Sequence, residues 1–120
     1  MSGADQKVVL VVDDEEVIRG MVSSILQLTG YRVLVAQDAE TAKQVASRCQ
    51  VHVLLTDIVM PGQNGFDLAR ELSAASGLKV VFMSGTHAYV PDDFPPETIV
   101  IRKPFGIQDM LDSVKKTIEA

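Results

Sequence analysis

Cysteine is almost absent from this sequence, and long apolar runs are missing altogether. Cys49 is the only cysteine, so no disulfide can form within the chain, and we expect its thiol to act as small apolar filler. No apolar run approaches the roughly 20 residues that a membrane-spanning helix needs. Residues 1–7 are polar and lack the apolar core of a signal peptide. These absences predict a cytoplasmic location with no membrane insertion.

Basic residues are in the minority. The chain has 11 Lys and Arg residues against 16 Asp and Glu residues, which gives a formal net charge of -5. Direct binding to a nucleic-acid backbone requires clustered positive charge, so no direct nucleic-acid binding is expected. The length of 120 residues and the hydrophobic content of 47% predict one folded domain spanning residues 1–120.

The apolar residues form short continuous runs that alternate with helical patterns. Continuous β-branched runs are typical of strands buried on both faces of a parallel sheet, and apolar residues spaced by three and four indicate amphipathic helices. The patterns predict strands at residues 8–12, 31–36, 51–55, 80–83 and 99–101, and helices at about 17–28, 38–48, 65–75 and 107–118.

This alternation predicts an α/β fold. Strands that alternate with helices form a parallel sheet covered on both faces. Five such units fit a flavodoxin-like (βα)5 three-layer sandwich with a five-stranded parallel sheet of order 2-1-3-4-5. The fourth unit is irregular, because Pro91, Pro95 and Pro96 remove amide donors between the last two strands. We therefore expect a fourth helix that is short or irregular, with at most one or two turns before Pro91.

The residues that follow the predicted strands carry the chemistry. Ligands of an open parallel sheet bind beyond the carboxyl ends of its strands. The groups at those positions are three carboxylates, a hydroxyl and an ammonium, supplied by Asp13, Asp14, Asp57, Ser84 and Lys103. Three neighbouring carboxylates repel one another unless a cation is present, and Mg²⁺ prefers such oxygen ligands. The sequence therefore predicts a magnesium site able to position a phosphoryl group.

The chain resembles the receiver domain of two-component response regulators. The resemblance rests on the order and spacing of four motifs: Val12-Asp13-Asp14-Glu15, Asp57-Ile58-Val59-Met60-Pro61 with Gly65, Met83-Ser84-Gly85 and Lys103-Pro104-Phe105. It implies a phosphorelay protein in which Asp57 accepts a phosphoryl group. It also implies that Asp13, Asp14, Asp57 and the backbone carbonyl of Val59 bind Mg²⁺ or Mn²⁺. Ser84 matches the switch hydroxyl, Lys103 the phosphate-binding lysine, and Pro104 a residue that often follows a cis peptide bond.

The resemblance also implies partners. A sensor histidine kinase or a histidine phosphotransfer protein would donate the phosphoryl group, and a phosphatase or a downstream output domain could act afterwards. The chain would not be an enzyme beyond self-phosphorylation and slow autodephosphorylation at Asp57. It would be either a stand-alone receiver or a part of a larger regulator or hybrid kinase.

Other interpretations of the same residues stand beside this one. Asp13 and Asp14 could serve as helix N-caps, and Glu15 and Glu16 are interpreted as first-turn helix charges. Val100 occupies the position where the family usually has an aromatic switch residue. That departure, with the proline-rich segment, leaves open a receiver-fold interaction module that acts without phosphorylation. Flavin-binding, Walker A and dinucleotide-binding patterns are absent.

Overall fold

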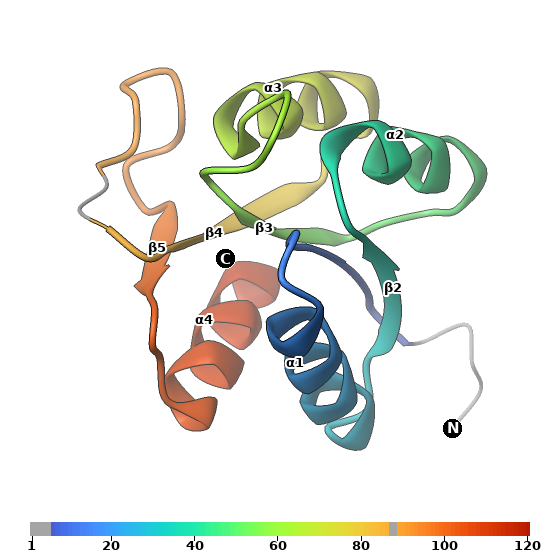
Figure 1. The fold of residues 1–120 in the computed structure, drawn as a ribbon, viewed down its shortest axis with the longest axis vertical. Helices are drawn as coiled ribbons and strands as arrows, with labels where there is room; N and C mark the ends of the chain where they lie inside the picture. The colour runs from blue at the N-terminus through green and yellow to red at the C-terminus, as the bar shows by residue number, and fades with distance from the viewer. Residues whose placement is uncertain (1–5, 87–88) are drawn as a thin grey trace.

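A five-stranded parallel sheet forms the centre of the molecule (Figure 1). The computed structural model describes residues 6–86 and 89–120. The sheet order is β2-β1-β3-β4-β5, as the sequence predicts. Its strands are β1 (Val8–Val12), β2 (Arg32–Ala36), β3 (Val53–Asp57), β4 (Lys79–Ser84) and β5 (Ile99–Arg102).

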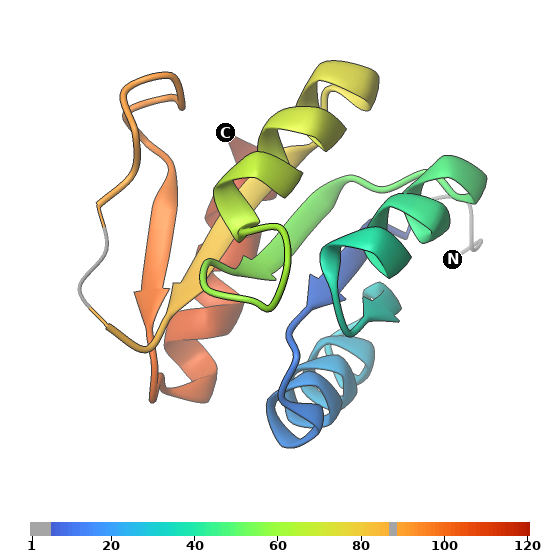
Figure 2. The ribbon, with the colours of Figure 1, turned by 45° about the horizontal axis from the view of Figure 1, so that its top comes forward.

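In the part of the chain that the structure describes, four helices cover the two faces of the sheet (Figures 1 and 2). The helices are α1 (Glu16–Leu28), α2 (Ala39–Arg48), α3 (Gly65–Ser76) and α4 (Ile107–Glu119). Helices α1 and α4 lie on one face, and α2 and α3 lie on the other (Figure 1). This is the predicted flavodoxin-like three-layer sandwich. No helix in residues 6–86 and 89–120 is long and apolar enough to cross a membrane.

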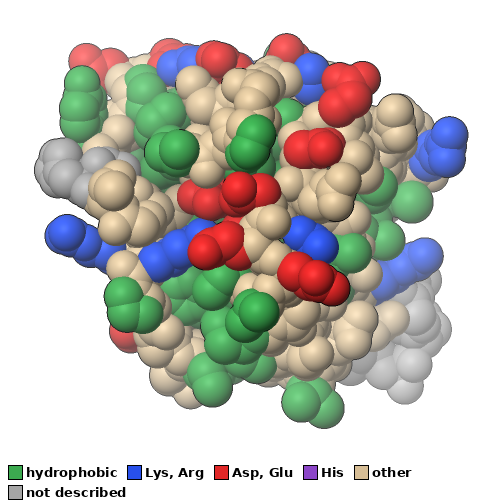
Figure 3. All heavy atoms as spheres, in the orientation of Figure 1, with side chains coloured by type: hydrophobic (Ala, Val, Ile, Leu, Met, Phe, Trp, Pro, Cys, Tyr) green, Lys and Arg blue, Asp and Glu red, His purple; other side chains and the backbone are tan. Residues whose placement is uncertain are grey.

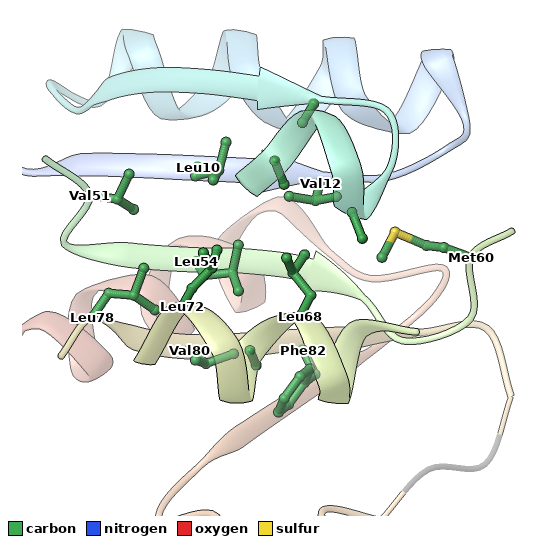
Figure 4. Close-up of a cluster of buried hydrophobic side chains, with 14 of the residues drawn as sticks. Leu10, Val12, Val51, Leu54, Met60, Leu68, Leu72, Leu78, Val80 and Phe82 are labelled. Atoms are coloured by element: carbon green, nitrogen blue, oxygen red, sulfur yellow. The ribbon is translucent and has the colours of Figure 1, made fainter. Parts of the chain in front are cut away.

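Each face of the sheet has its own apolar core. Alternate residues of a strand point to opposite faces, so in β1 Leu10 and Val12 pack towards α2 and α3, whereas Val9 and Val11 pack towards α1 and α4. Figure 4 shows the first of these cores, in which side chains of β1, β3 and β4 meet those of α3. All five β1 residues are buried, which explains why this strand is a continuous apolar run.

The predicted start of α2 is confirmed, whereas both predicted ends of β3 are wrong by two residues. The Asp38 side chain accepts a hydrogen bond from the Thr41 N–H, which confirms it as the N-cap of α2. Strand β3 begins and ends two residues later than predicted, and it includes Thr56 and Asp57. These polar residues continue the strand because Thr56 pairs with both β1 and β4 and Asp57 pairs with β4, a contribution that hydrophobic patterning does not detect.

The connection between β4 and β5, residues 85–98, is the irregular part of the fold. No helix is present in its described residues, and two turns close by hydrogen bonds from Phe94 N to Pro91 O and from Thr98 N to Pro95 O. This agrees with the expected irregular fourth helix, although residues 87 and 88 of the predicted one or two turns lie outside the described residues. In Figure 2 the connection rises beside β5 at the edge of the sheet.

Phe94 anchors this connection to the core. Its ring packs edge-on against Phe82 of β4 at 5.3 Å between centroids, and it lies 6.0 Å from Phe66 of α3. Arg70 of α3 lies over the same ring at 5.3 Å and also binds the Asp93 carboxylate through Nε at 2.6 Å. Aromatic packing and one arginine therefore hold the segment that replaces a helix.

Candidate functional site

The predicted site residues meet at the carboxyl edge of the sheet. Parallel register aligns Val12 with Thr56, Asp57 with Met83, and Ser84 with Arg102. The residues at or just beyond these strand ends therefore come together. One carboxylate oxygen from each of Asp13, Asp14 and Asp57 lies within 4.8 Å of the others. Figure 3 shows acidic side chains gathered near the middle of the visible face, with basic side chains beside them. We call the group of Asp13, Asp14, Asp57 and Lys103 the acidic site.

Lys103 supplies the cation of the acidic site. Its Nζ lies 2.7 Å from Asp13 Oδ2 and 3.2 Å from both Asp57 Oδ2 and Glu15 Oε2. The lysine follows β5, and its backbone N–H donates to the Ser84 carbonyl at 2.7 Å, which ties the β5 end to the β4 end. The Lys103–Pro104 peptide bond is cis, as the resemblance implies.

Asp13 is fully buried and only partly satisfied. Its Oδ1 accepts the Glu15 N–H at 2.9 Å, and its Oδ2 makes no aligned hydrogen bond although Lys103 Nζ is close. A buried carboxylate oxygen normally has such a partner. The incompletely satisfied oxygen, together with the carboxylates of Asp14 and Asp57, forms a donor set that fits a hard divalent cation such as Mg²⁺. Asp14 is exposed, so the donor set has an open side.

The pKa values of Asp57 and Lys103 shift for different reasons. Burial raises the pKa of Asp57; the Lys103 charge opposes this rise, and the Asp13 charge adds to it. Burial on its own would lower the pKa of Lys103, but contact with Asp13 and Asp57 outweighs that effect and raises it. Lys103 therefore stays protonated at neutral pH and keeps a positive charge beside Asp57.

Gly65 makes room for the Asp57 backbone. A Cβ atom on Gly65 would overlap the carbonyl oxygen of Asp57 and press against Ile58 Cα. The Gly65 N–H instead donates to the Ile58 carbonyl at 2.8 Å, which draws the start of α3 against the end of β3. Thr56 Oγ1 donates to the same Asp57 carbonyl at 2.9 Å. The glycine is therefore required by space and not by an unusual φ angle.

Ser84 and Val59 lie next to the acidic site without joining its ion pairs. The Ser84 side chain is 2% exposed, and its hydroxyl donates to the Thr86 carbonyl at 2.7 Å and accepts from the Thr86 N–H at 3.2 Å. Val59 follows Asp57 by two residues in the β3–α3 loop, and its side chain is exposed. Val100 pairs with Phe82 in the register and packs with Phe94 against the same core.

Sequence reasoning missed one residue of the site. Glu15 was interpreted as a first-turn helix charge, but it precedes α1 at the N-cap, and its carboxylate contacts Lys103 Nζ. The sequence offered one signal, because Glu is a poor N-cap residue and Ser, Thr, Asp or Asn would normally stand there. His52, by contrast, has a structural role, since its Nδ1 accepts the Val8 N–H at 2.9 Å.

A family model identifies the family to which this chain belongs. The model of the response regulator receiver domain matches residues 9–115. The chain belongs to the response regulator receiver domain family. The match covers every strand end that contributes to the acidic site, so the receiver domain of two-component signalling is the setting in which these residues act.

Proteins from several bacteria are similar to this chain. The response regulator receiver protein CpdR of Brucella abortus is 31% identical over 95% of this chain and 98% of its own length. The protein PetR of Rhodobacter capsulatus is 27% identical over 85% of this chain but only 49% of its own length. The chain spans about a third of the Escherichia coli regulator ArcA and about half of PetR and of the Streptococcus pneumoniae regulator RR06.

Solved structures have the same fold. A response regulator receiver protein from Sinorhizobium medicae superposes with a TM-score of 0.87 at 23% identity, covering 98% of both chains. The receiver domain of the hybrid histidine kinase CckA gives a TM-score of 0.79 at 28% identity, covering 92% of this chain and 98% of that one.

Proposed function

We propose that this chain is a phosphoacceptor receiver domain, spanning residues 1–120, in which Asp57 accepts a phosphoryl group. One observation carries the proposal: Asp57 shares a cluster of three carboxylate oxygens within 4.8 Å while its Oδ2 lies 3.2 Å from Lys103 Nζ. The observation supports the proposal because it brings together the carboxylate proposed as acceptor, the oxygens proposed as cation ligands and the ammonium proposed to bind the phosphoryl group. Those are the components that positioning and charge neutralisation in phosphoryl transfer require.

The proposed donor is a phosphohistidine on a sensor histidine kinase or a histidine phosphotransfer protein. An oxygen of the Asp57 carboxylate attacks phosphorus and forms a new O–P bond while the P–N bond of the donor breaks. The electron pair of that bond stays on the imidazole nitrogen, and the product is an acyl phosphate on Asp57. Lys103 then binds a phosphate oxygen as a point charge. The domain performs this transfer on itself and is not otherwise an enzyme.

Asp13, Asp14, Asp57 and the backbone carbonyl of Val59 are the proposed ligands of Mg²⁺ or Mn²⁺. The ion, when bound, supplies positive charge that screens an anionic donor from the carboxylates. The chain's own contribution is to hold the buried Asp13 carboxylate rigidly, through the Glu15 N–H and the Lys103 ammonium. Such fixed ligands avoid reorganisation when the charge on Asp57 changes.

Ser84 is the proposed link between phosphorylation and the surface. Its hydroxyl is held by Thr86, one residue beyond the exposed Gly85. A phosphate on Asp57 would offer this hydroxyl a charged acceptor in place of the Thr86 carbonyl. The exchange would draw the start of the β4–β5 connection towards the acidic site. An interaction surface built on that connection would then shift between two states and reach a phosphatase or an output domain.

The experiment is incubation of the protein with acetyl phosphate and Mg²⁺, followed by intact-mass measurement. We expect one added phosphoryl group, and we expect none in Asp57→Asn. Asp92→Asn is the matched control, because it removes an equally charged aspartate from the exposed β4–β5 connection. Unchanged labelling of Asp57→Asn would contradict the proposed acceptor. A cytoplasmic location, where kinases and Mg²⁺ are available, completes the proposal.

The second candidate is a receiver-fold interaction module that works without phosphorylation. The observation that favours it is Val100, which leaves no aromatic side chain at the usual switch position. A titration with Mg²⁺, followed by amide NMR shifts, separates the two functions. A phosphoacceptor gives saturable shifts at Asp13, Asp14 and Asp57, whereas an inert module gives none.

A further inference from the structure

Lys103 has three carboxylate neighbours, and one of them is outside the proposed acceptor and metal ligands. We propose that Glu15 is a positioning residue that competes with the phosphoryl group on Asp57 for the ammonium of Lys103. Glu15 would thereby set how strongly the phosphorylated form is favoured. This inference rests on the proposed function, because it concerns regulation of the same site.

The geometry places Glu15 at the open side of Lys103. The Glu15 Oε2 and the Asp57 Oδ2 each lie 3.2 Å from Lys103 Nζ, while the buried Asp13 Oδ2 lies at 2.7 Å. The Lys103 side chain is 13% exposed and that of Glu15 is 61% exposed. The ammonium is therefore held from inside by the buried Asp13 and Asp57, and Glu15 contacts it from the exposed side.

Glu15 is free for this role because it does not cap the helix. It stands at the N-cap of α1, but its side chain makes no capping hydrogen bond. Its backbone N–H, which any residue would supply, donates to Asp13 Oδ1 at 2.9 Å. Removing the carboxylate therefore leaves the helix start and the Asp13 contact in place, and changes the charge beside Lys103.

Competition follows from the number of donors. An ammonium has three N–H bonds, and Lys103 Nζ already donates to Asp57 Oδ2 and Glu15 Oε2 and forms an ion pair with Asp13 Oδ2. A phosphoryl group on Asp57 brings further anionic oxygens to the same ammonium. When this phosphoryl group binds Lys103, it either displaces the Glu15 carboxylate or lies close to it, so that two anionic groups repel each other. Either outcome weakens the phosphorylated form relative to a chain with a neutral residue at position 15.

The test uses beryllofluoride with Mg²⁺, a non-covalent mimic of a phosphoryl group on a carboxylate. Its dissociation constant is measured by NMR for the wild-type chain, Glu15→Gln and Glu16→Gln, each at Mg²⁺ saturation determined for that variant. Glu16→Gln is the matched control, since it removes the same charge from the adjacent exposed residue, which has no ion pair among residues 6–86 and 89–120.

We expect Glu15→Gln to bind beryllofluoride about two- to fivefold more tightly, the range that an exposed ion pair accounts for. Glu16→Gln should stay close to the wild-type value. Equal constants for the two variants, or weaker binding by Glu15→Gln, would overturn the inference while leaving the acceptor role intact. Failure of the wild-type chain to bind beryllofluoride would instead contradict the proposed function itself.

A second measurement reports the contact without any phosphoryl mimic. The ¹⁵Nζ and ¹³Cε shifts of Lys103 should change in Glu15→Gln and stay unchanged in Glu16→Gln, because Glu15 contacts this ammonium. Unchanged Lys103 shifts in Glu15→Gln would also overturn the inference. A thermal melt of each variant establishes that it is folded, so a loss of folding cannot be mistaken for a change at Lys103.

Discussion

The acidic site and the β4–β5 connection lie at the same end of β4, yet they are built in different ways. The acidic site consists of residues that end or directly follow strands, so the parallel register fixes their positions. The described residues of the connection, residues 85–98, form no strand pairs, and the packing of Phe94 and Arg70 holds the connection in place. The chemistry therefore depends on the sheet, whereas the surface that would transmit it depends on side-chain packing.

This difference has a consequence for a receiver domain. Residues at strand ends cannot move in space without disturbing the sheet. The spatial arrangement of the acidic site can therefore be the same in different members of a family. A connection held by a few side chains can change without disturbing the sheet, and loops generally tolerate such variation. Phe94 illustrates this point, since the packing of its ring against Phe82 and Phe66 ties this part of the connection to the core.

The largest expected effect is a loss of stability when a side chain is added next to the Asp57 backbone. Gly65→Ala places a Cβ against the Asp57 carbonyl, and overpacking of this kind costs about 1–3 kcal/mol or more. We expect reduced stability in urea unfolding and reduced labelling by acetyl phosphate. Gly20→Ala is the control, because its Cβ would meet open space in the interior of α1. It should gain about 0.5–1 kcal/mol, and a similar gain by Gly65→Ala would contradict the role assigned to that glycine.

Truncating the anchor of the connection should cost stability without affecting the acceptor. Phe94→Ala removes a partly buried ring that packs against Phe82 and Phe66, and we expect a loss of roughly 2 kcal/mol. Phe94→Leu keeps most of the apolar volume and should lose less. Acetyl phosphate should still label Asp57 in both variants. Loss of labelling in folded Phe94→Ala would mean that the connection and the acidic site are not separate.

Removing the charge of Asp57 should stabilise the metal-free chain. Burial raises the pKa of Asp57, so folding binds an extra proton at pH values between the ordinary pKa and the raised one. Stability therefore falls as the pH rises through that window, and the ionised carboxylate destabilises the fold above it. In EDTA at pH 7 we expect Asp57→Asn to gain on the order of 1 kcal/mol in urea unfolding.

The sign of this effect can be checked in two ways. The gain of Asp57→Asn should shrink as the pH falls below the window, where Asp57 is protonated in both states. It should also shrink when Mg²⁺ is added, because the ion binds the folded wild-type chain more tightly than the variant. A gain that is independent of both pH and Mg²⁺ would indicate another cause.

The smallest expected effect is the pH dependence of stability that Asp93 of the β4–β5 connection causes, and its sign is opposite to that of Asp57. The hydrogen bond from Arg70 lowers the pKa of Asp93, so this carboxylate stabilises the fold above its ordinary pKa and loses that effect as the pH falls through the lowered value. We expect only a slight change because both side chains are largely exposed. A ¹³C NMR titration of Asp93 should show the lowered pKa, and Arg70→Gln should return it to the ordinary value.

The fold and most of the acidic site could be predicted from the sequence. The Val8–Val12 run and the helical spacings specify alternating elements, and the strand ends then place Asp13, Asp57 and Lys103 together. These predictions succeed because hydrophobic period and strand order are properties of short segments and simple topology. The irregular β4–β5 connection was also predictable, since proline limits helix formation wherever it occurs.

Contacts between individual side chains, beyond the grouping of the strand ends, could not be predicted from the sequence. Glu15 and Lys103 are 88 residues apart, and their ion pair exists because β1 and β5 end at the same edge of the sheet. Phe94 finds Phe82 and Phe66 for a similar reason, and Gly65 needs its small size because the Asp57 carbonyl lies directly beside it. Local sequence thus specifies which elements form and which chemical groups end them. Three-dimensional packing determines which of those groups touch, because contact depends on distances that no local pattern encodes.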